Sequence, residues 1–106
     1  MHLYHQSPAE SHSFDANLAR LHGVDEAIMI NHLTYHIKAK IRMGEKEREG
    51  RVWYYQTRAE FAAWFGYWSE KQIKRIMRSL VKQKVIVEGN FNKSPIDKTI
   101  WYAFEN

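Results

Sequence analysis

The sequence predicts a single α+β domain, in which helices pack on a small antiparallel sheet that includes a C-terminal β-hairpin. Three observations support this class. Apolar residues recur at helical spacing up to about residue 43. Two short stretches, 57–60 and 69–72, carry helix-start signals. After residue 83 the apolar pattern becomes that of two strands separated by a polar loop.

The size and composition of the chain fit one folded unit. It has 106 residues, of which 44% are hydrophobic, and it contains four Trp, six Tyr and five Phe. This is enough apolar surface for a core, so a disordered chain is not expected. No apolar run approaches the roughly 18 residues that a spanning helix needs, and the first residues lack the layout of a signal peptide. We therefore expect a cytoplasmic protein without membrane contact.

The N-terminal residues differ from the rest of the chain. Residues 1–12 are polar and without periodicity, which predicts a flexible arm, and the domain then covers residues 13–106. A first short helix is expected to begin at a Ser13 cap and to end at Gly23 in the left-handed conformation.

A longer helix is expected from about residue 25 to residue 43. One of its sides carries a stripe of apolar residues: Ala27, Ile30, Leu33, Ile37 and Ile41. Other apolar residues lie off this stripe, so the helix is expected to be buried on more than one side or to offer a face to a partner. The charged, glycine-bracketed segment 44–51 predicts an exposed loop, and residues 52–56 predict a strand.

The next two helices have explicit starts. Thr57 and Glu60 have the spacing of a capping box, in which each side chain bonds the backbone of the other residue, and Ser69 and Gln72 repeat it. Trp68 precedes the second cap and has the spacing of a hydrophobic staple to Ile73.

Apolar and basic residues separate on the helix that follows Ser69. At about 100° per residue, one side carries Ile73, Ile76, Met77 and Leu80. The opposite side carries Lys71, Arg75, Arg78 and Lys82, which we name the basic ridge. The net charge of the chain is +4, and residues 69–84 contain six Lys or Arg but one Glu. An ordinary solvated face usually interleaves Glu with Lys, so this surface is typical of phosphate binding.

The order of elements predicts a winged helix-turn-helix. A capped helix, a turn of about three residues and a capped basic helix form a helix-turn-helix, whose second helix lies in the DNA major groove. The hairpin after it would be the wing. Lys71, Arg75 and Arg78 are expected to face the groove, with Lys74 and Lys82 nearer the phosphates. The remaining candidate contacts are Tyr67 in the turn, Ser69 and Gln72 at the helix start, and Asn90, Asn92, Lys93 and Lys98 in the wing; for the two asparagines ordinary turn chemistry is an equal alternative.

A family resemblance supports this interpretation. The segment FGYWSEKQIKRIMRSLVKQKVIVEGNFNKSPIDKTIWYAF resembles the winged helix-turn-helix at the start of phage and plasmid replication proteins, including DnaD-like replisome organisers. The matching positions are Tyr67, Trp68, Ser69, Gly89, Asn90, Asn92, Lys93, Asp97, Thr99, Trp101 and Tyr102. Similarity covers about residues 14–104 and implies DNA binding in replication initiation. The chain departs from the pattern at Gly66, which replaces a proline, at His36 and Lys98, and at Lys84-Val85, where the usual glycine is missing.

Other chemistries have weaker support. Cysteine is absent, which excludes disulfides and thiolate sites. His32 and His36 are one helical turn apart, but no third metal ligand is evident. Nothing resembles a nucleophile elbow or a glycine-rich phosphate loop, so neither catalysis nor a cofactor is expected. Most aromatic residues between 53 and 65 are expected in the core rather than stacked on single-stranded bases.

Two functions remain open. The first is non-catalytic binding of double-stranded DNA, in phage or plasmid replication initiation. The alternative is a protein-interaction module on the same scaffold, which uses the helix of residues 25–43 to form a homodimer, to dock to a replication protein or to inhibit one. The two can coexist, because winged domains often bind paired half-sites as dimers.

Overall fold

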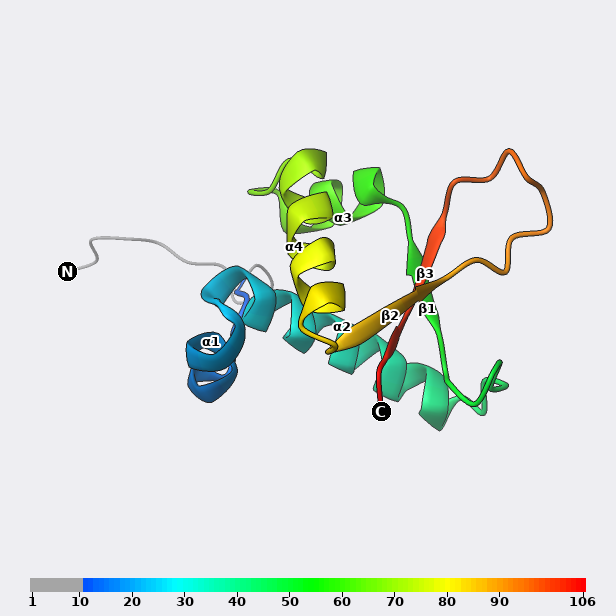
Figure 1. Ribbon diagram of the computed structural model, residues 1–106, viewed down its shortest axis with the longest axis horizontal. Helices are drawn as coiled ribbons and strands as arrows, with labels where there is room; N and C mark the ends of the chain where they lie inside the picture. The colour runs from blue at the N-terminus through cyan, green and yellow to red at the C-terminus, as the bar shows by residue number, and fades with distance from the viewer. Residues whose placement is uncertain (1–10) are drawn as a thin grey trace.

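The computed structural model describes residues 11–106, so ten of the twelve residues of the predicted arm lie outside the described part. Within this part, four helices accompany a three-stranded antiparallel sheet of strand order β1-β3-β2 (Figure 1). The elements are α1 (Ala16–His22), α2 (Val24–Arg42), β1 (Tyr54–Gln56), α3 (Arg58–Phe65), α4 (Glu70–Lys82), β2 (Ile86–Gly89) and β3 (Ile100–Phe104). The predicted α+β class is confirmed.

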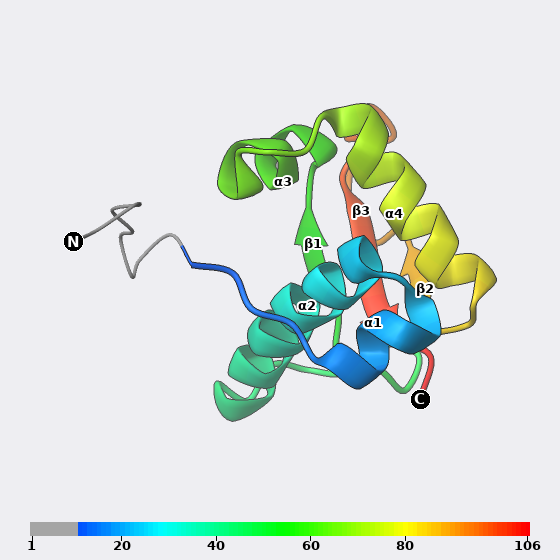
Figure 2. The ribbon, with the colours of Figure 1, turned by 90° about the vertical axis from the view of Figure 1, so that its left-hand side faces the viewer.

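The first two helices meet at Gly23. The predicted Ser13 cap is wrong: Asp15 caps α1, because its Oδ1 lies next to the first turn and accepts hydrogen bonds from Asn17 N at 2.7 Å and Leu18 N at 3.1 Å. Gly23 ends α1 with φ +113°, which an L-residue rarely adopts, and a Cβ there would lie 2.7 Å from Glu26 Oε1. A glycine therefore permits the sharp change of direction into α2 (Figure 2).

Helix α2 is buried on more than one side, as predicted. Ala27, Ile30, Leu33 and Ile37 of the apolar stripe are buried. Met29, which lies off the stripe, is also fully buried. The stripe ends earlier than expected, because Ile41 is 57% exposed.

Both capping boxes are confirmed. Thr57 Oγ1 accepts from Glu60 N at 3.1 Å, and Glu60 Oε1 accepts from Thr57 N at 2.9 Å. Gly66 then ends α3 at φ +78°, in the left-handed region that the turn requires. At the end of α4, Lys84 adopts φ +61°, in the left-handed region where a helix end usually has glycine. Lys84 N donates to Val81 O and Val85 N to Leu80 O, which are the two bonds of a Schellman motif.

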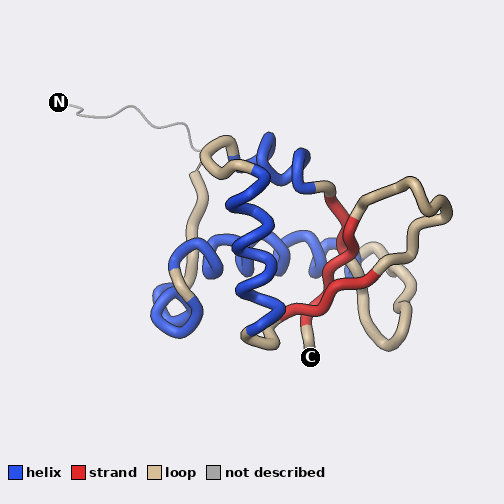
Figure 3. The backbone as a smooth tube through the Cα atoms, turned by 45° about the horizontal axis from the view of Figure 1, so that its top comes forward, coloured by secondary structure: helices blue, strands red, loops and turns tan. Residues whose placement is uncertain are grey.

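The sheet is short and lies beside the helices. β1 begins two residues later than predicted and pairs with β3 from Tyr54 opposite Tyr102 to Gln56 opposite Ile100. β2 and β3 form the predicted hairpin, with Ile86 opposite Phe104 and Gly89 opposite Trp101. Figure 3 shows the loop between them extending away from the helices.

The core fills the space between the helices and one face of the sheet. Its fully buried side chains come from every element except α1 and β1, and they include Met29, Leu33, Phe61, Ile73, Ile76, Met77, Leu80, Ile86 and Tyr102. Trp68 and Ile73 both belong to this core, in agreement with the predicted staple. The core fixes the side of α4 that faces inward, and the rest of the helix is left at the surface.

Candidate nucleic-acid interface

The outer side of α4 carries the basic ridge. Its four apolar residues are buried as predicted, so the opposite side faces solvent. Lys71, Arg78 and Lys82 are exposed, and within residues 11–106 none of them forms an ion pair. Lys74 is half-buried on the flank of the helix. Three free positive charges on one rigid helix form a surface that can approach a phosphate backbone.

Arg75 differs from the other residues of the ridge. Its guanidinium donates to Asp25 Oδ2 at 2.7 Å, and both side chains are about half exposed. The expectation that the ridge lacks acidic partners holds within α4 but is wrong for the folded chain, because α2 supplies this carboxylate. The pair holds Arg75 toward α2 and lowers the positive charge that it offers to a ligand.

At the start of α4, fewer hydrogen-bonding groups are free for a ligand than the sequence indicates. Ser69 Oγ accepts from Gln72 N at 3.1 Å, and Gln72 Oε1 accepts from Ser69 N at 2.8 Å. What remains for a ligand is the hydroxyl hydrogen of Ser69 and the Nε2 group of Gln72. Both residues are exposed at the helix N-terminus, where the backbone dipoles favour an anion.

Tyr67 lies in the turn between α3 and α4 and is 51% exposed. Its hydroxyl is 2.7 Å from His12 Nδ1. Burial, and then the carboxylate of Asp25, raise the pKa of Tyr67 above its ordinary value, so the phenol remains a hydrogen-bond donor at neutral pH. His12, the last residue of the predicted arm, is therefore attached to this turn. Its ring also stacks on Trp64 of α3, with ring centroids 4.7 Å apart and an angle of 10° between the planes.

In the hairpin loop, some polar side-chain groups hold the loop together and others remain at the surface. The Asn92 amide donates to Asp97 O at 3.1 Å and Thr99 O at 2.7 Å, and its Oδ1 accepts from Trp101 Nε1 at 2.7 Å. The side chain of Asn92 thus closes the loop and already donates both of its amide hydrogens, which favours the turn-chemistry alternative over the predicted DNA contact. Asn90 Oδ1 accepts from Asn92 N in a local turn, which leaves its amide nitrogen at the surface.

The loop and the start of α4 lie close together. The cap residue Thr57, the first two residues of α3, Glu70 of α4 and residues 97–100 line one hollow of about 230 Å³. Lys93 and Lys98 are exposed on this loop. The structure therefore brings most predicted site residues onto two neighbouring surfaces, the outer side of α4 and the hairpin loop. Sequence reasoning missed Arg58, which lines the same hollow and whose Nε is buried without a hydrogen bond.

The expected burial of the aromatic residues is only partly right. Trp53, Phe61 and Phe65 are buried, but Tyr55 and Trp64 are each about half exposed. Residue type alone does not predict which of these aromatic side chains are buried. Their burial depends on the register of β1 and on which side of α3 faces the core.

The two histidines of α2 contact each other. Their ring centroids are 4.4 Å apart, and no group of three His, Cys, Asp or Glu in the described residues could hold a metal ion. Burial, and then the neighbouring His36, lower the pKa of His32 from 6.5 to about 4; a hydrogen bond with Gln56 opposes this shift, and His12 adds a smaller lowering effect. His32 is thus a neutral, buried ring at pH 7.

Acid should destabilise the domain through His32. Between pH 6.5 and pH 4 the unfolded chain binds more protons than the folded chain, because its histidine keeps the ordinary pKa. The free energy of unfolding should therefore fall as the pH drops through this range, by an amount on the order of 2 kcal/mol after allowance for solvent screening. Urea unfolding at a series of pH values measures this change.

The control for this prediction is the pair of variants His32→Gln and His36→Gln. His32→Gln should remove most of this fall in the free energy of unfolding. His36→Gln should remove less of it, because the His36 ring is less buried. Parallel stability curves for the wild type and His32→Gln would contradict the assignment.

The chain matches no protein-family model, and no significantly similar curated protein or solved structure was found. None of the helices in residues 11–106 has the length and apolar character needed to cross a membrane.

Proposed function

We propose that this chain is a non-catalytic winged helix-turn-helix module that binds double-stranded DNA. The observation that carries the proposal is the set of three exposed, unpaired cations Lys71, Arg78 and Lys82 on one side of α4. α3, the turn and α4 would form the helix-turn-helix, with α4 in the major groove, and the β2–β3 loop would be the wing. A role in phage or plasmid replication initiation rests on the sequence resemblance.

The proposed DNA contacts come from side chains that are not already engaged within the protein. Lys71 and Arg78 are the groove-facing candidates, and Lys82 lies further along the helix, toward the phosphates. Lys93, Lys98 and Asn90 would contact the backbone from the wing. Tyr67 could donate to a phosphate once its contact with His12 opens.

A salt titration with a duplex of about 20 base pairs tests the proposal. If three to five phosphates are neutralised, affinity should fall about 40- to 500-fold between 50 and 200 mM salt. Arg78→Ala should reduce the slope of log affinity against log salt by about 1. Lys46→Ala, in the exposed loop of residues 44–51, is the matched control and should leave the slope unchanged. A salt-independent affinity would rule out the proposed interface.

Removal of the Asp25 charge should strengthen DNA binding. Asp25→Asn frees Arg75 from the 2.7 Å ion pair and removes a negative charge beside α4. Since exposed ion pairs contribute little to stability, the fold should persist, and we expect the affinity to rise about 3- to 10-fold. Fluorescence anisotropy with labelled duplex measures it.

The matched control for Asp25→Asn is Glu45→Gln. Glu45 pairs with Lys40 at 3.9 Å, away from α4, and its neutralisation changes the net charge by the same amount. This variant should change affinity by less than about 2-fold. Weaker binding by Asp25→Asn would instead mean that the ion pair holds Arg75 in its DNA-contacting position.

A protein-interaction module is the second candidate, and one observation favours it. Large apolar side chains are exposed on α1, on α2 and at the C-cap of α2: Leu21 (73%), Val24, Tyr35 (63%), Ile41 and Met43. Such residues on neighbouring helices could dock a second copy or a replication protein. Sedimentation over a range of concentrations would detect a homodimer, and it is independent of the DNA titration.

A further inference from the structure

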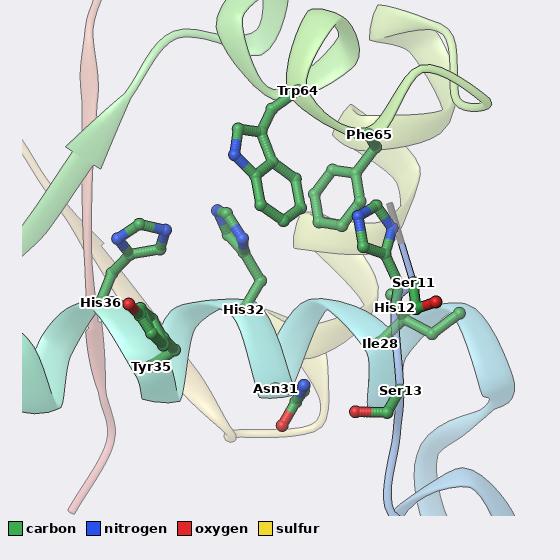
Figure 4. Close-up of a pocket in the computed structure, with 10 residues that line it drawn as sticks. All are labelled: Ser11, His12, Ser13, Ile28, Asn31, His32, Tyr35, His36, Trp64 and Phe65. Carbon is green, nitrogen blue, oxygen red and sulfur yellow. The ribbon is translucent and has the colours of Figure 1, made fainter. Parts of the chain in front are cut away.

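A hollow of about 390 Å³ lies between α2, α3 and the segment of residues 11–13 (Figure 4). Its volume falls within the range of small-molecule sites, about 300–1,000 Å³. Figure 4 shows Trp64 from α3 and His32 from α2 pointing toward each other in its wall. None of the proposed DNA-contacting residues lines this hollow.

The walls of the hollow are mainly flat rings. Trp64 is half exposed and is 4.5 Å from the His32 ring between centroids, while Tyr35 is 63% exposed at the edge. Large aromatic side chains expose this much surface beside a cavity at an energetic cost, which a stacked ligand would relieve. The parallel contact of His12 with Trp64 shows that the indole accepts a planar heteroaromatic ring at stacking distance.

Two of the three histidines that line the hollow, His32 and His36, have a lowered pKa and are neutral at pH 7. The ten lining residues include no Asp, Glu, Lys or Arg. Burial keeps the pKa of His32 at about 4, and burial and then Lys40 lower the pKa of His36. Each neutral imidazole offers one donor and one acceptor, and the amide of Asn31 offers both. A charged ligand would lose its hydration here without gaining an opposite charge, which is costly. An uncharged polar ligand would find hydrogen-bond partners.

We propose that this hollow binds an uncharged, planar heteroaromatic molecule, stacked on Trp64 and hydrogen-bonded by His32 or Asn31. The ligand would lie beside the contact of Trp64 with His32, between Asn31 and Tyr35 of α2 and the Trp64–His12 pair. The groups around His32 are His36 on the same helix, His12 from the N-terminal segment, Phe61, Trp64 and Phe65 from α3, and Tyr54 and Gln56 from β1. The proposal does not depend on DNA binding.

Titration with small probes tests this site. Indole and adenine are neutral and planar, benzoate is planar but charged, and cyclohexanol is neutral but not planar. For ligands of about ten non-hydrogen atoms we expect dissociation constants on the order of 1 mM for indole or adenine at pH 7.5, and at least about 10-fold weaker binding for the other two. NMR shifts of the four Trp indole signals report the location. Equal binding of all four probes, or none up to about 10 mM, would overturn the proposal.

Variants separate stacking from other effects. Trp64→Ala should weaken indole or adenine binding at least about 10-fold. Tyr55→Ala, an equally exposed aromatic on β1, is the matched control and should have no effect. His12→Ala should change the affinity by less than about 3-fold, because His12 is a wall and not the ligand. If the probes bind only to the His12→Ala variant, the hollow serves only to hold the His12 side chain, and the proposal fails.

Discussion

Reversal of two charges on α4, Lys71→Glu together with Arg78→Glu, should weaken duplex binding by at least about 100-fold at 50 mM salt. Each substitution removes a favourable phosphate interaction and replaces it with repulsion. Both side chains are exposed, and Glu has nearly the helix propensity of Lys and Arg, so α4 should still form. Fluorescence anisotropy measures binding, and thermal unfolding checks the fold.

The control for this double variant carries the same change in net charge elsewhere. Lys38→Glu with Lys46→Glu alters the exposed side of α2 and the following loop, away from α4. It should lose less than about 5-fold in affinity, through the long-range field alone. An equal loss in both double variants would show that binding depends on net charge and not on the basic ridge. A ridge variant that loses DNA but keeps a partner protein would separate the two candidate functions.

Phe61→Ala should produce the largest loss of stability of any single aromatic truncation on α3, about 3–5 kcal/mol in the free energy of unfolding. The ring is fully buried, and its centroid lies 5.7 Å from that of His32 and 5.9 Å from that of Tyr102. Its removal leaves a cavity at the point where α2, α3 and β3 meet. Because small domains are stable by about 5–15 kcal/mol, this is a large fraction of the total. Denaturant unfolding measures it.

Trp64→Ala is the matched control on the same helix. It removes a larger ring, but one that is half exposed, so the loss should stay below about 2 kcal/mol. Phe61→Leu, which conserves most of the volume, should cost about 1 kcal/mol. If Trp64→Ala destabilised the domain more than Phe61→Ala, the inward side of α3 would have been assigned wrongly.

Local signals account for the parts of the fold that the sequence predicted well. The capping boxes at Thr57 and Ser69 depend on residues three apart, so both helix starts were correct. The apolar side of α4 was correct for the same reason, since periodicity within one helix decides it. Ser13 was wrong because Asp15, two residues later, competes for the same role and lies nearer the first free N–H groups.

Contacts between distant residues account for what could not be predicted. Arg75 pairs with Asp25 and His12 with Tyr67 across 50 and 55 residues of sequence. Neither pairing leaves a periodic or spacing signal, because it follows from the way in which α2 packs against α4 and the N-terminal segment against the turn. The electrostatic balance of the candidate interface was therefore visible only after the helices had been placed.

Asn92 has a consequence for the kinetics of any complex. Its three hydrogen bonds tie together a loop of ten residues, 90–99, that contains no regular strand pairing. Conformational freedom in this loop is thus lost when the domain folds and not when a ligand arrives. Association should follow rigid docking, with a rate constant set by diffusion and by attraction between charges.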